Sequence, residues 1–332
     1  MRKLAFTAIA LALPLAATAY AEDNAPGKVI SPYAVIHTVP DLDKSTAFYR
    51  DKVGLEIDSA PLFAANATKE LAALTNAKGA KVRSTTFKIP GSELHLILLQ
   101  FSGVEKKHVE ARIQDPGVVK LVIRVRDIDK PFAAVQQDIK GVFSTGGAPV
   151  HPEGPEQRVQ AVIVKDPDGF ALEFVLANAD IKSPAPATSN IVGGWASLVV
   201  ENEDQSLKFY GEQLGFKINK GRVLAPSVLA LEGTPDASVT NTGTRPPGSE
   251  FTWFVYDFRN IDRKALHSKM QDVGNSAVAM LATNLPELVK SVTANGATPE
   301  TNGKPLPLGE NARAVAVRDP SGIPFILVEQ TR

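Results

Sequence analysis

Short apolar runs rich in β-branched residues alternate with amphipathic segments along most of the chain. The first run, Ala34–Val39, predicts a strand, and Asp41 behind it is a suitable N-cap for a helix that ends near Gly54. An Ala- and Leu-rich segment then predicts an additional helix, and a Pro-Gly-Ser turn separates two further predicted strands. These later elements cover residues 62–78, 82–89 and 94–101. The pattern predicts one βαβββ module with an inserted helix.

The same order of elements recurs further along the chain. The second module is predicted to have strands and a helix over 120–125, 128–140, 159–165 and 170–176. A type I turn at Asp166-Pro167-Asp168-Gly169 precedes its last strand. Two more modules cover 195–258 and 277–330, and the Gly-, Pro- and Thr-rich segment 234–249 predicts a mobile loop.

The second half of the chain also repeats the first half in sequence. The matching segments are Asp41–Tyr49 with Asn202–Tyr210, 101–127 with 258–284, and Asp166–Gly169 with Asp319–Gly322. Their order and similar spacing indicate a duplication, so the chain is predicted to consist of two similar halves with two modules each.

The N-terminus has the pattern of a secretory signal peptide. Met1-Arg2-Lys3 precedes an apolar run interrupted by Pro14, and Ala19-Tyr20-Ala21 forms a small-x-small cleavage site. We expect cleavage after Ala21 and a periplasmic location. No other stretch approaches the roughly 20 apolar residues that a membrane-spanning helix needs, so we expect no membrane partner.

Composition excludes several kinds of chemistry. The 332 residues contain no cysteine, which removes disulfides, thiolate nucleophiles and zinc–thiolate sites. The 36 basic and 36 acidic residues balance, and no basic tract is typical of a nucleic-acid interface. The predicted partner is therefore a small molecule and not nucleic acid, and the oligomeric state stays open.

These motifs resemble the vicinal oxygen chelate superfamily, which includes glyoxalase I, the extradiol dioxygenases and the bleomycin resistance proteins. The resemblance rests on V-x-D-L-x-x-S-x-x-F-Y after a strand, a following Gly-Leu or Gly-Phe, and D-P-D-G before a later strand. It covers about Pro32 to Gln330.

The resemblance implies an α+β fold of four βαβββ modules in two tandem halves, each half a cupped mixed sheet with helices on the outside. The implied organisation is a signal peptide, a first domain, a linker and a second domain, over residues 1–21, 32–181, 182–190 and 191–330. Whether the modules pair within each half or across the halves stays open.

In this superfamily each cup binds a divalent metal through two residues per module. One lies on the first strand, seven positions before the Asp of the strand-to-helix turn, and the other is a Glu on the final strand. The matching pairs here are Ala34 and Ile97, Lys120 and Glu173, Trp195 and Phe254, and Ala277 and Ile326. Because one carboxylate does not hold a divalent ion, we expect neither this metal nor another cofactor.

Lys120 and Glu173 are the first candidates for chemistry, since both should face one cup. They predict either a pair that acts on an acidic or carbonyl group of a ligand, or a salt bridge that replaces the metal. His95 lies two positions before Ile97 and should face a cup, as a general base, an incomplete metal ligand or a core histidine. His37 has the opposite parity and should face the helices. The remaining histidines are predicted to be surface or structural residues: His108, His151 and His267.

Aromatic residues at the second-half positions favour either an apolar, planar ligand or simple packing. They are Phe251, Trp253, Phe254 and Trp195. Arg124 and Arg126 follow Lys120 and predict either contacts with an anion at the rim or exposed structural arginines.

The leading hypothesis is a periplasmic, metal-independent protein that binds a small aromatic or carbonyl compound. The residues expected around this ligand are Ala34, His95, Ile97, Lys120, Glu173, Trp195 and Phe254. One alternative is a metal-dependent lyase or extradiol-type dioxygenase with a rearranged site built on His95 and Glu173. Another is a scaffold whose cups are filled. Whether the protein is an enzyme stays open.

Overall fold

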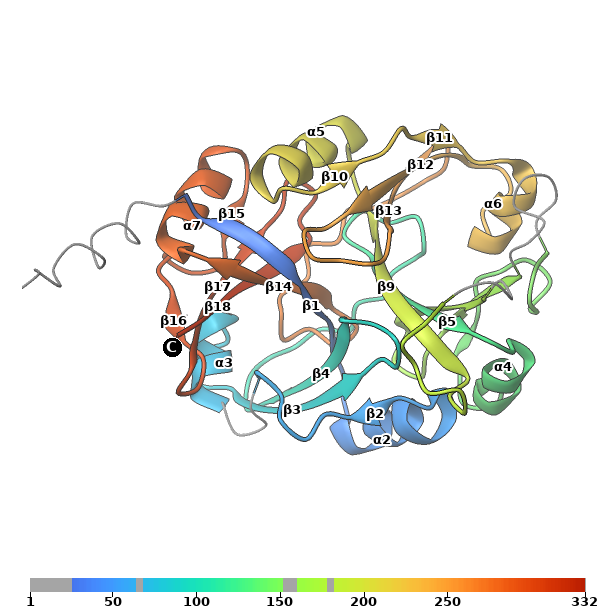
Figure 1. The fold of residues 1–332 in the computed structure, drawn as a ribbon, viewed down its shortest axis with the longest axis horizontal. Helices are drawn as coiled ribbons and strands as arrows, with labels where there is room; N and C mark the ends of the chain where they lie inside the picture. The colour runs from blue at the N-terminus through green and yellow to red at the C-terminus, as the bar shows by residue number, and fades with distance from the viewer. Residues whose placement is uncertain (1–25, 64–67, 152–159, 178–181, 332) are drawn as a thin grey trace, which may run out of the picture.

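The computed structural model describes residues 26–63, 68–151, 160–177 and 182–331. Over these residues the chain forms two mixed β-sheets of nine strands each, with short helices around them (Figure 1). The predicted α+β class with βαβββ modules is confirmed. The predicted signal peptide, residues 1–21, lies outside the described residues.

Modules one and two form the N-terminal half. Module one contains β1 (Lys28–Thr38), α2 (Leu42–Ala47), the π-helical turn η1 (Phe48–Val53), β2 (Glu56–Ile57), α3 (Thr68–Leu74), β3 (Lys81–Lys88) and β4 (His95–Ser102). Module two contains β5 (Val119–Val125), α4 (Asp129–Val135), β6 (Gly141–Val142), β7 (Ala161–Lys165) and β8 (Ala171–Leu176). The predicted strands are found within one or two residues, except that β1 begins six residues before the predicted Ala34. The helices α3 and α4 end earlier than predicted, at Leu74 and Val135.

Modules three and four form the C-terminal half. Module three contains β9 (Ile191–Val199), α5 (Glu203–Lys208), η3 (Phe209–Gln213), β10 (Lys217–Ile218), β11 (Arg222–Val223), α6 (Pro226–Glu232), β12 (Ser238–Arg245) and β13 (Trp253–Arg259). Module four contains β14 (Ser276–Thr283), α7 (Leu285–Ala294), β15 (Thr298–Pro299), β16 (Leu306–Pro307), β17 (Ala312–Arg318) and β18 (Pro324–Gln330). The prediction of a loop over 234–249 is wrong, because its β-branched residues form β12, which pairs with β13.

Each sheet combines modules from both halves. One sheet has the order β15-β17-β18-β14-β1-β4-β3-β2, and the other has the order β10-β12-β13-β9-β5-β8-β7-β6. Antiparallel pairing of β1 with β14 joins modules one and four, and pairing of β5 with β9 joins modules two and three. We call these the 1–4 sheet and the 2–3 sheet.

This pairing corrects the expectation that each half forms its own sheet. The first strands of the modules are similarly apolar, so the hydrophobic pattern specifies which face is buried but not which strand lies alongside. The question that the sequence left open is answered here, since the modules pair across the halves.

Local signals in the sequence set the ends of the helices. The Asp41 carboxylate accepts a hydrogen bond from the Lys44 backbone N–H at 3.2 Å, and Asn202 caps α5 in the same way from Gln205 at 3.0 Å. Gly54 ends η1 in the left-handed region at φ 88°. Both the predicted cap and the predicted helix end are confirmed.

Two inserted helices cover the concave faces of the sheets, which we call the 1–4 bowl and the 2–3 bowl. In the 1–4 bowl, Leu71 and Leu74 of α3 belong to one buried apolar cluster with strand residues such as Ile97. In the 2–3 bowl, Val228 and Leu229 of α6 belong to a cluster with β12 and β13. None of the helices in the described ranges is long and apolar enough to span a membrane.

Candidate functional site in the 2–3 bowl

Strand register places the superfamily's metal-ligand positions in two matching sets. On the first strands, Ala34 pairs with Ala279 in the 1–4 sheet, as Lys120 pairs with Ser197 in the 2–3 sheet. The pairing of first strands with final strands also matches. Ile36 lies beside Ile97 in the 1–4 sheet, and Val122 lies beside Glu173 in the 2–3 sheet. The set in the 1–4 bowl is Ala34, Ile97, Ala277 and Ile326, and the set in the 2–3 bowl is Lys120, Glu173, Trp195 and Phe254.

The 1–4 set does not fit a metal ion. Its four members are fully buried hydrocarbon side chains, and they pack under α3 with Phe63 and Leu71. None carries a nitrogen or oxygen on its side chain, whereas transition metals need imidazole, carboxylate or thiolate ligands. Hydrocarbon fills this bowl where the superfamily places an ion.

The 2–3 set does not fit a metal ion either, because it contains an ammonium group. Lys120 is fully buried, and its Nζ lies 2.7 and 2.9 Å from the two carboxylate oxygens of Glu232 on α6. Glu173 Oε2 lies 3.4 Å from the same Nζ, which also stands 4.1 Å from the centre of the Tyr256 ring. The cation in this bowl is therefore the lysine itself.

The electrostatics of this cluster favour a salt bridge over a catalytic base. Burial works to lower the pKa of Lys120, but the carboxylates of Glu232 and Glu173 outweigh it and raise that pKa. Burial raises the pKa of Glu173 to about 7, against the opposing influence of Lys120. A lysine that retains its proton is a poor base or nucleophile, so the structure favours the second of the two interpretations of Lys120 and Glu173.

Sequence reasoning missed two members of the cluster. Glu232 is the charged residue of α6, whose other residues are apolar apart from Ser227, and Tyr256 alternates with Phe254 and Phe258 on one face of β13. A lone charge in an apolar helix is a usable signal that a partner lies nearby. The partner itself, Lys120, is 112 residues away in the sequence.

His95 lies in the 1–4 sheet, away from the 2–3 bowl. Its Nδ1 is 3.2 Å from the Tyr33 carbonyl oxygen, and its Nε2 is 3.6 Å from Asp58 Oδ2. Burial lowers the pKa of His95. It lines a pocket of about 530 Å³ with Tyr33, Asp58 and Glu310. Because His95 and Glu173 belong to different sheets, the structure does not bring together the rearranged metal site built on these two residues.

The remaining histidines lie away from the 2–3 bowl. His37 is fully buried on the helix side of β1, where it stacks on Phe170 at 4.5 Å between ring centres. The prediction that His37 faces the helices is confirmed. The side chains of His108, His151 and His267 are exposed, as expected for surface residues.

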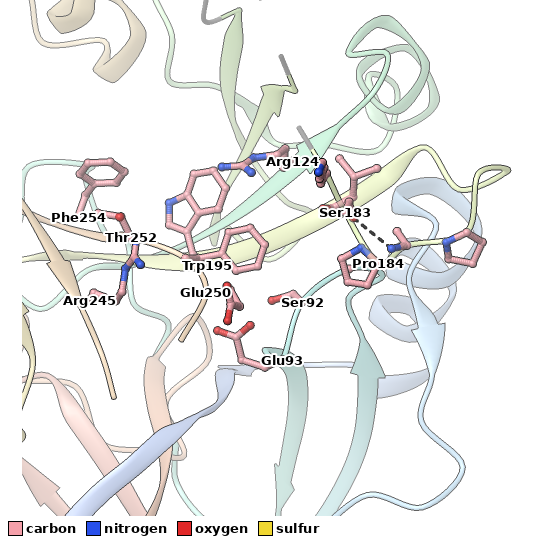
Figure 2. Close-up of a pocket in the computed structure, with 16 residues that line it drawn as sticks. Ser92, Glu93, Arg124, Ser183, Pro184, Trp195, Arg245, Glu250, Thr252 and Phe254 are labelled. Atoms are coloured by element: carbon pink, nitrogen blue, oxygen red, sulfur yellow. Dashed lines mark hydrogen bonds between the residues drawn. The ribbon is translucent and has the colours of Figure 1, made fainter. Parts of the chain in front are cut away.

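A pocket of about 820 Å³ opens where Trp195 and Phe254 reach the edge of the 2–3 bowl (Figure 2). The Trp195 and Phe251 rings stack at 5.8 Å with 16° between their planes. The Arg124 guanidinium carbon lies 5.0 Å from the Trp195 ring centre and 5.3 Å from that of Phe251. Arg245 lines the same pocket. Two of the superfamily's four ligand positions in this sheet thus form an aromatic wall with arginines beside it.

Two polar groups of this wall lack partners within the described residues. The Trp195 Nε1 is buried and donates no hydrogen bond there. The Arg124 guanidinium contacts the two rings but has no ion pair or hydrogen bond with a described residue. The Arg124 side chain is half-buried, and this burial lowers the pKa of its guanidinium from the ordinary value. A buried donor and a half-buried cation are groups that a ligand can satisfy.

Glycine and a neighbouring turn shape the pocket. A Cβ atom at Gly193 would lie 2.5 Å from Phe251 Cζ, so glycine allows this ring to lie over β9. The turn between β3 and β4 contributes Ser92 and Glu93 from the 1–4 sheet (Figure 2). Ser92 Oγ donates to the Gly194 carbonyl at 2.7 Å, and Ser249 Oγ donates to Glu93 at 2.6 Å. The pocket is therefore held by both sheets.

Comparison with known proteins agrees with this geometry. Residues 33–174 match the model of the Glyoxalase/Bleomycin resistance protein/Dioxygenase superfamily. Glyoxalase I from Zea mays has a similar structure, with a TM-score of 0.54, 17% sequence identity, and coverage of 91% of this chain and 92% of that chain. A putative dioxygenase from Bacillus subtilis has a TM-score of 0.55 at 13% identity, over 92% of this chain and 86% of that one. No curated protein matches the sequence significantly.

The fold is of the glyoxalase type, with four βαβββ modules in two mixed sheets. The family model matches residues 33–174, so the resemblance to the glyoxalase/bleomycin resistance/dioxygenase superfamily, the vicinal oxygen chelate superfamily, is confirmed for that part of the chain. At these identities the structural neighbours establish the fold alone.

Proposed function

We propose that this protein binds a small planar organic anion, an aromatic or carbonyl compound that carries a carboxylate, in the pocket of the 2–3 bowl. The observation that carries the proposal is an aromatic wall that combines a buried donor without a partner among the described residues, Trp195 Nε1, with the half-buried cation of Arg124. A ligand ring that packs against the outer side of the stacked Trp195 and Phe251 pair would place its acidic group within reach of Arg124. Arginine and tryptophan side chains provide both stacking and directed hydrogen bonds to such a ligand.

This binding function needs no metal at the superfamily's positions. Four hydrocarbon side chains stand at these positions in the 1–4 bowl, and Lys120 stands among them in the 2–3 bowl. The alternative of a metal-dependent lyase or extradiol-type dioxygenase has the support of the fold, but fold does not determine function. We place the binding protein in the periplasm on the basis of the N-terminal pattern, and sequencing of the mature N-terminus from a periplasmic fraction, expected at Glu22, tests this location.

Isothermal titration calorimetry with benzoate, phenylglyoxylate and phenylpyruvate tests the binding proposal. We expect at least one of these probes to bind, and Arg124→Gln to weaken that binding about tenfold or more, because a charge-assisted hydrogen bond contributes about 1.5–3 kcal/mol. Trp195→Phe retains a ring but removes the N–H donor, and it should weaken binding by a smaller factor.

Arg126→Gln is the matched control. Arg126 is exposed two residues after Arg124 and does not line the pocket. It should leave affinity unchanged. Equal losses in the Arg124 and Arg126 variants, or no heat of binding with any of the three probes, would contradict the proposal.

A further inference from the structure

A second group of ionisable residues lies on the other side of the sheets, where module one contacts module two. There the helix α2–η1 packs against the turn Asp166–Gly169, and we call this contact the first joint. Tyr49 donates a hydrogen bond to Asp166 Oδ2 at 2.8 Å, and Ser45 donates to Asp168 Oδ2 at 2.7 Å. Both carboxylates are buried, at 0% and 8% exposure. The His37 side chain reaches the same place from β1 and is fully buried.

His37 points into this carboxylate pair without a hydrogen bond. Its Nε2 lies 3.4 Å from Asp166 Oδ2, and neither ring nitrogen is hydrogen-bonded to any described residue. Burying an imidazole whose ring nitrogens make no hydrogen bonds is energetically unfavourable, unless another group binds to one of these nitrogens.

The spacing of the ligand atoms agrees with a shared ion. One atom each of His37, Asp166 and Asp168 lie within 4.8 Å of one another. Two ligand atoms that are each about 2.1 Å from one ion lie about 3.4 Å apart at a tetrahedral angle. The 3.4 Å between Nε2 and Oδ2 is therefore long for a hydrogen bond and suitable for a common metal ion.

The duplicated half provides an internal comparison, which we call the second joint. There α5–η3 packs on the turn Asp319–Gly322, and Tyr210 donates to Asp319 Oδ2 at 2.5 Å. The two hydroxyls of Ser206 and Ser321 lie 2.9 Å apart. Leu198 stands at the position of His37, and Ser321 at that of Asp168. Since the second joint holds a helix against a turn without them, the additional histidine and carboxylate are not required for packing.

A surface pocket reaches one carboxylate of the first joint, that of Asp168. Ser45 and Asp168 line a pocket of about 630 Å³ whose wall also carries the carboxylates of Asp41, Asp51 and Asp138. Lys44 and Lys52 line the same wall and pair with Asp41 and Asp138, so carboxylates outnumber ammonium groups there but do not stand alone. An entry path is one of the features that a metal site needs.

We propose that the first joint binds one divalent transition-metal ion through His37 Nε2 and the carboxylates of Asp166 and Asp168. Imidazole with carboxylates suits Zn²⁺, Mn²⁺ or Fe²⁺. The hydroxyls of Tyr49 and Ser45 would hold the two carboxylates in position for the ion. The ion would also balance the negative charge of two buried carboxylates. This site is separate from the ligand pocket and from the superfamily's positions in the bowls.

Titration of the untagged, chelator-treated protein with Zn²⁺ tests the proposal by calorimetry and by metal analysis after dialysis. We expect one equivalent of Zn²⁺ and a rise in the melting temperature. Asp168→Ser and His37→Leu recreate the residues of the second joint, and each should weaken Zn²⁺ binding at least a hundredfold. X-ray absorption of the Zn²⁺-loaded protein should show one nitrogen and at least two oxygen ligands near 2.0–2.1 Å.

His95→Gln is the control, because His95 also lies close to a carboxylate, that of Asp58, and lines a pocket. This variant should retain the stoichiometric Zn²⁺ site. Asp168→Ser should fold, since serine occupies that position in the second joint, and circular dichroism verifies this. Failure of the wild-type protein to retain an equivalent of Zn²⁺, or unchanged affinity in both joint variants, would overturn the proposal.

Discussion

The 1–4 bowl and the 2–3 bowl have the same strand register but hold different side chains at matching positions. Ala34 and Ala279 face each other in the first, and Lys120 and Ser197 face each other in the second. Each bowl is covered by an inserted helix, with leucines from α3 in one and Glu232 from α6 in the other. The two bowls therefore show two ways of filling the space in which the superfamily places an ion.

The two bowls depend on different contributions to stability, apolar packing in one and paired charges in the other. Hydrocarbon side chains stabilise the 1–4 bowl by removing apolar surface from water, and they need no partners. The charges of the 2–3 bowl require one another, because each would be strongly unfavourable if it were buried alone. The open aromatic pocket adjoins the charged bowl, where Trp195 and Phe254 replace smaller apolar residues of the other set. Mutations at matching positions should therefore have different effects.

Lys120→Met should cause the largest loss of stability. It removes the ammonium group and leaves Glu232 and Glu173 buried without a cation, which costs about 3–5 kcal/mol in comparable buried pairs. Chemical denaturation at neutral pH measures the change in free energy of unfolding. Combining Lys120→Met with Glu173→Gln and Glu232→Gln should recover a large part of it. A loss below about 1 kcal/mol for Lys120→Met alone would contradict our account of the cluster.

Ile97→Ala tests the apolar bowl at the position that matches Glu173. Ile97 is fully buried under α3, so the cavity should cost about 2–4 kcal/mol, within the range of large-to-small core substitutions. The loss should be independent of pH between 5 and 8, since the matching set in this bowl contains no titratable group. Ile97→Val is the matched control, with an expected cost of about 1 kcal/mol. A strong pH dependence would show that the bowl is not purely apolar.

Glu173→Gln tests the charged bowl through its pH dependence. Burial raises the pKa of Glu173 from 4.5 to about 7, so between these values the folded protein retains a proton that the unfolded chain has released. This group therefore makes the folded state less stable as pH rises from about 4.5 to 7. Glutamine does not titrate, so the stability of the variant relative to wild type should increase by about 2–3 kcal/mol over that range. If the stability of the variant and of the wild type changed in parallel with pH, the raised pKa of Glu173 would be refuted.

Much of the local structure could be predicted because it depends on neighbouring residues. The Asp41 cap, the Gly54 helix end and the Asp166–Gly169 turn each follow from a few adjacent residues. Counting back from Asp41 also placed Ala34 correctly in the bowl, because a strand has a fixed period of two. These features need no knowledge of the tertiary fold.

Contacts between distant segments could not be predicted in the same way. The pairing of β1 with β14 joins similar apolar strands, and nothing in their pattern distinguishes this partner from β5 or β9. Glu232 reaches Lys120 only because α6 folds over the 2–3 bowl, and the pocket forms only where Ser92 and Glu93 of the 1–4 sheet meet Trp195. The candidate site was therefore predicted in part, with Trp195, Phe254, Lys120 and Glu173 named but their partners missed.

Ser197→Ala should have the smallest effect, and one of opposite sign. Ser197 pairs with Lys120 as Ala279 pairs with Ala34, and its buried Oγ has no hydrogen-bond partner within the described residues. An unsatisfied hydroxyl is unfavourable in the interior, so its removal should raise the free energy of unfolding by up to about 1 kcal/mol. The reverse substitution, Ala279→Ser, should lower it by about 1–2 kcal/mol, because it introduces such a hydroxyl into the apolar bowl. If Ser197→Ala instead destabilises the protein by more than 1 kcal/mol, the hydroxyl has a partner in the charged cluster and the bowls differ more than their register indicates.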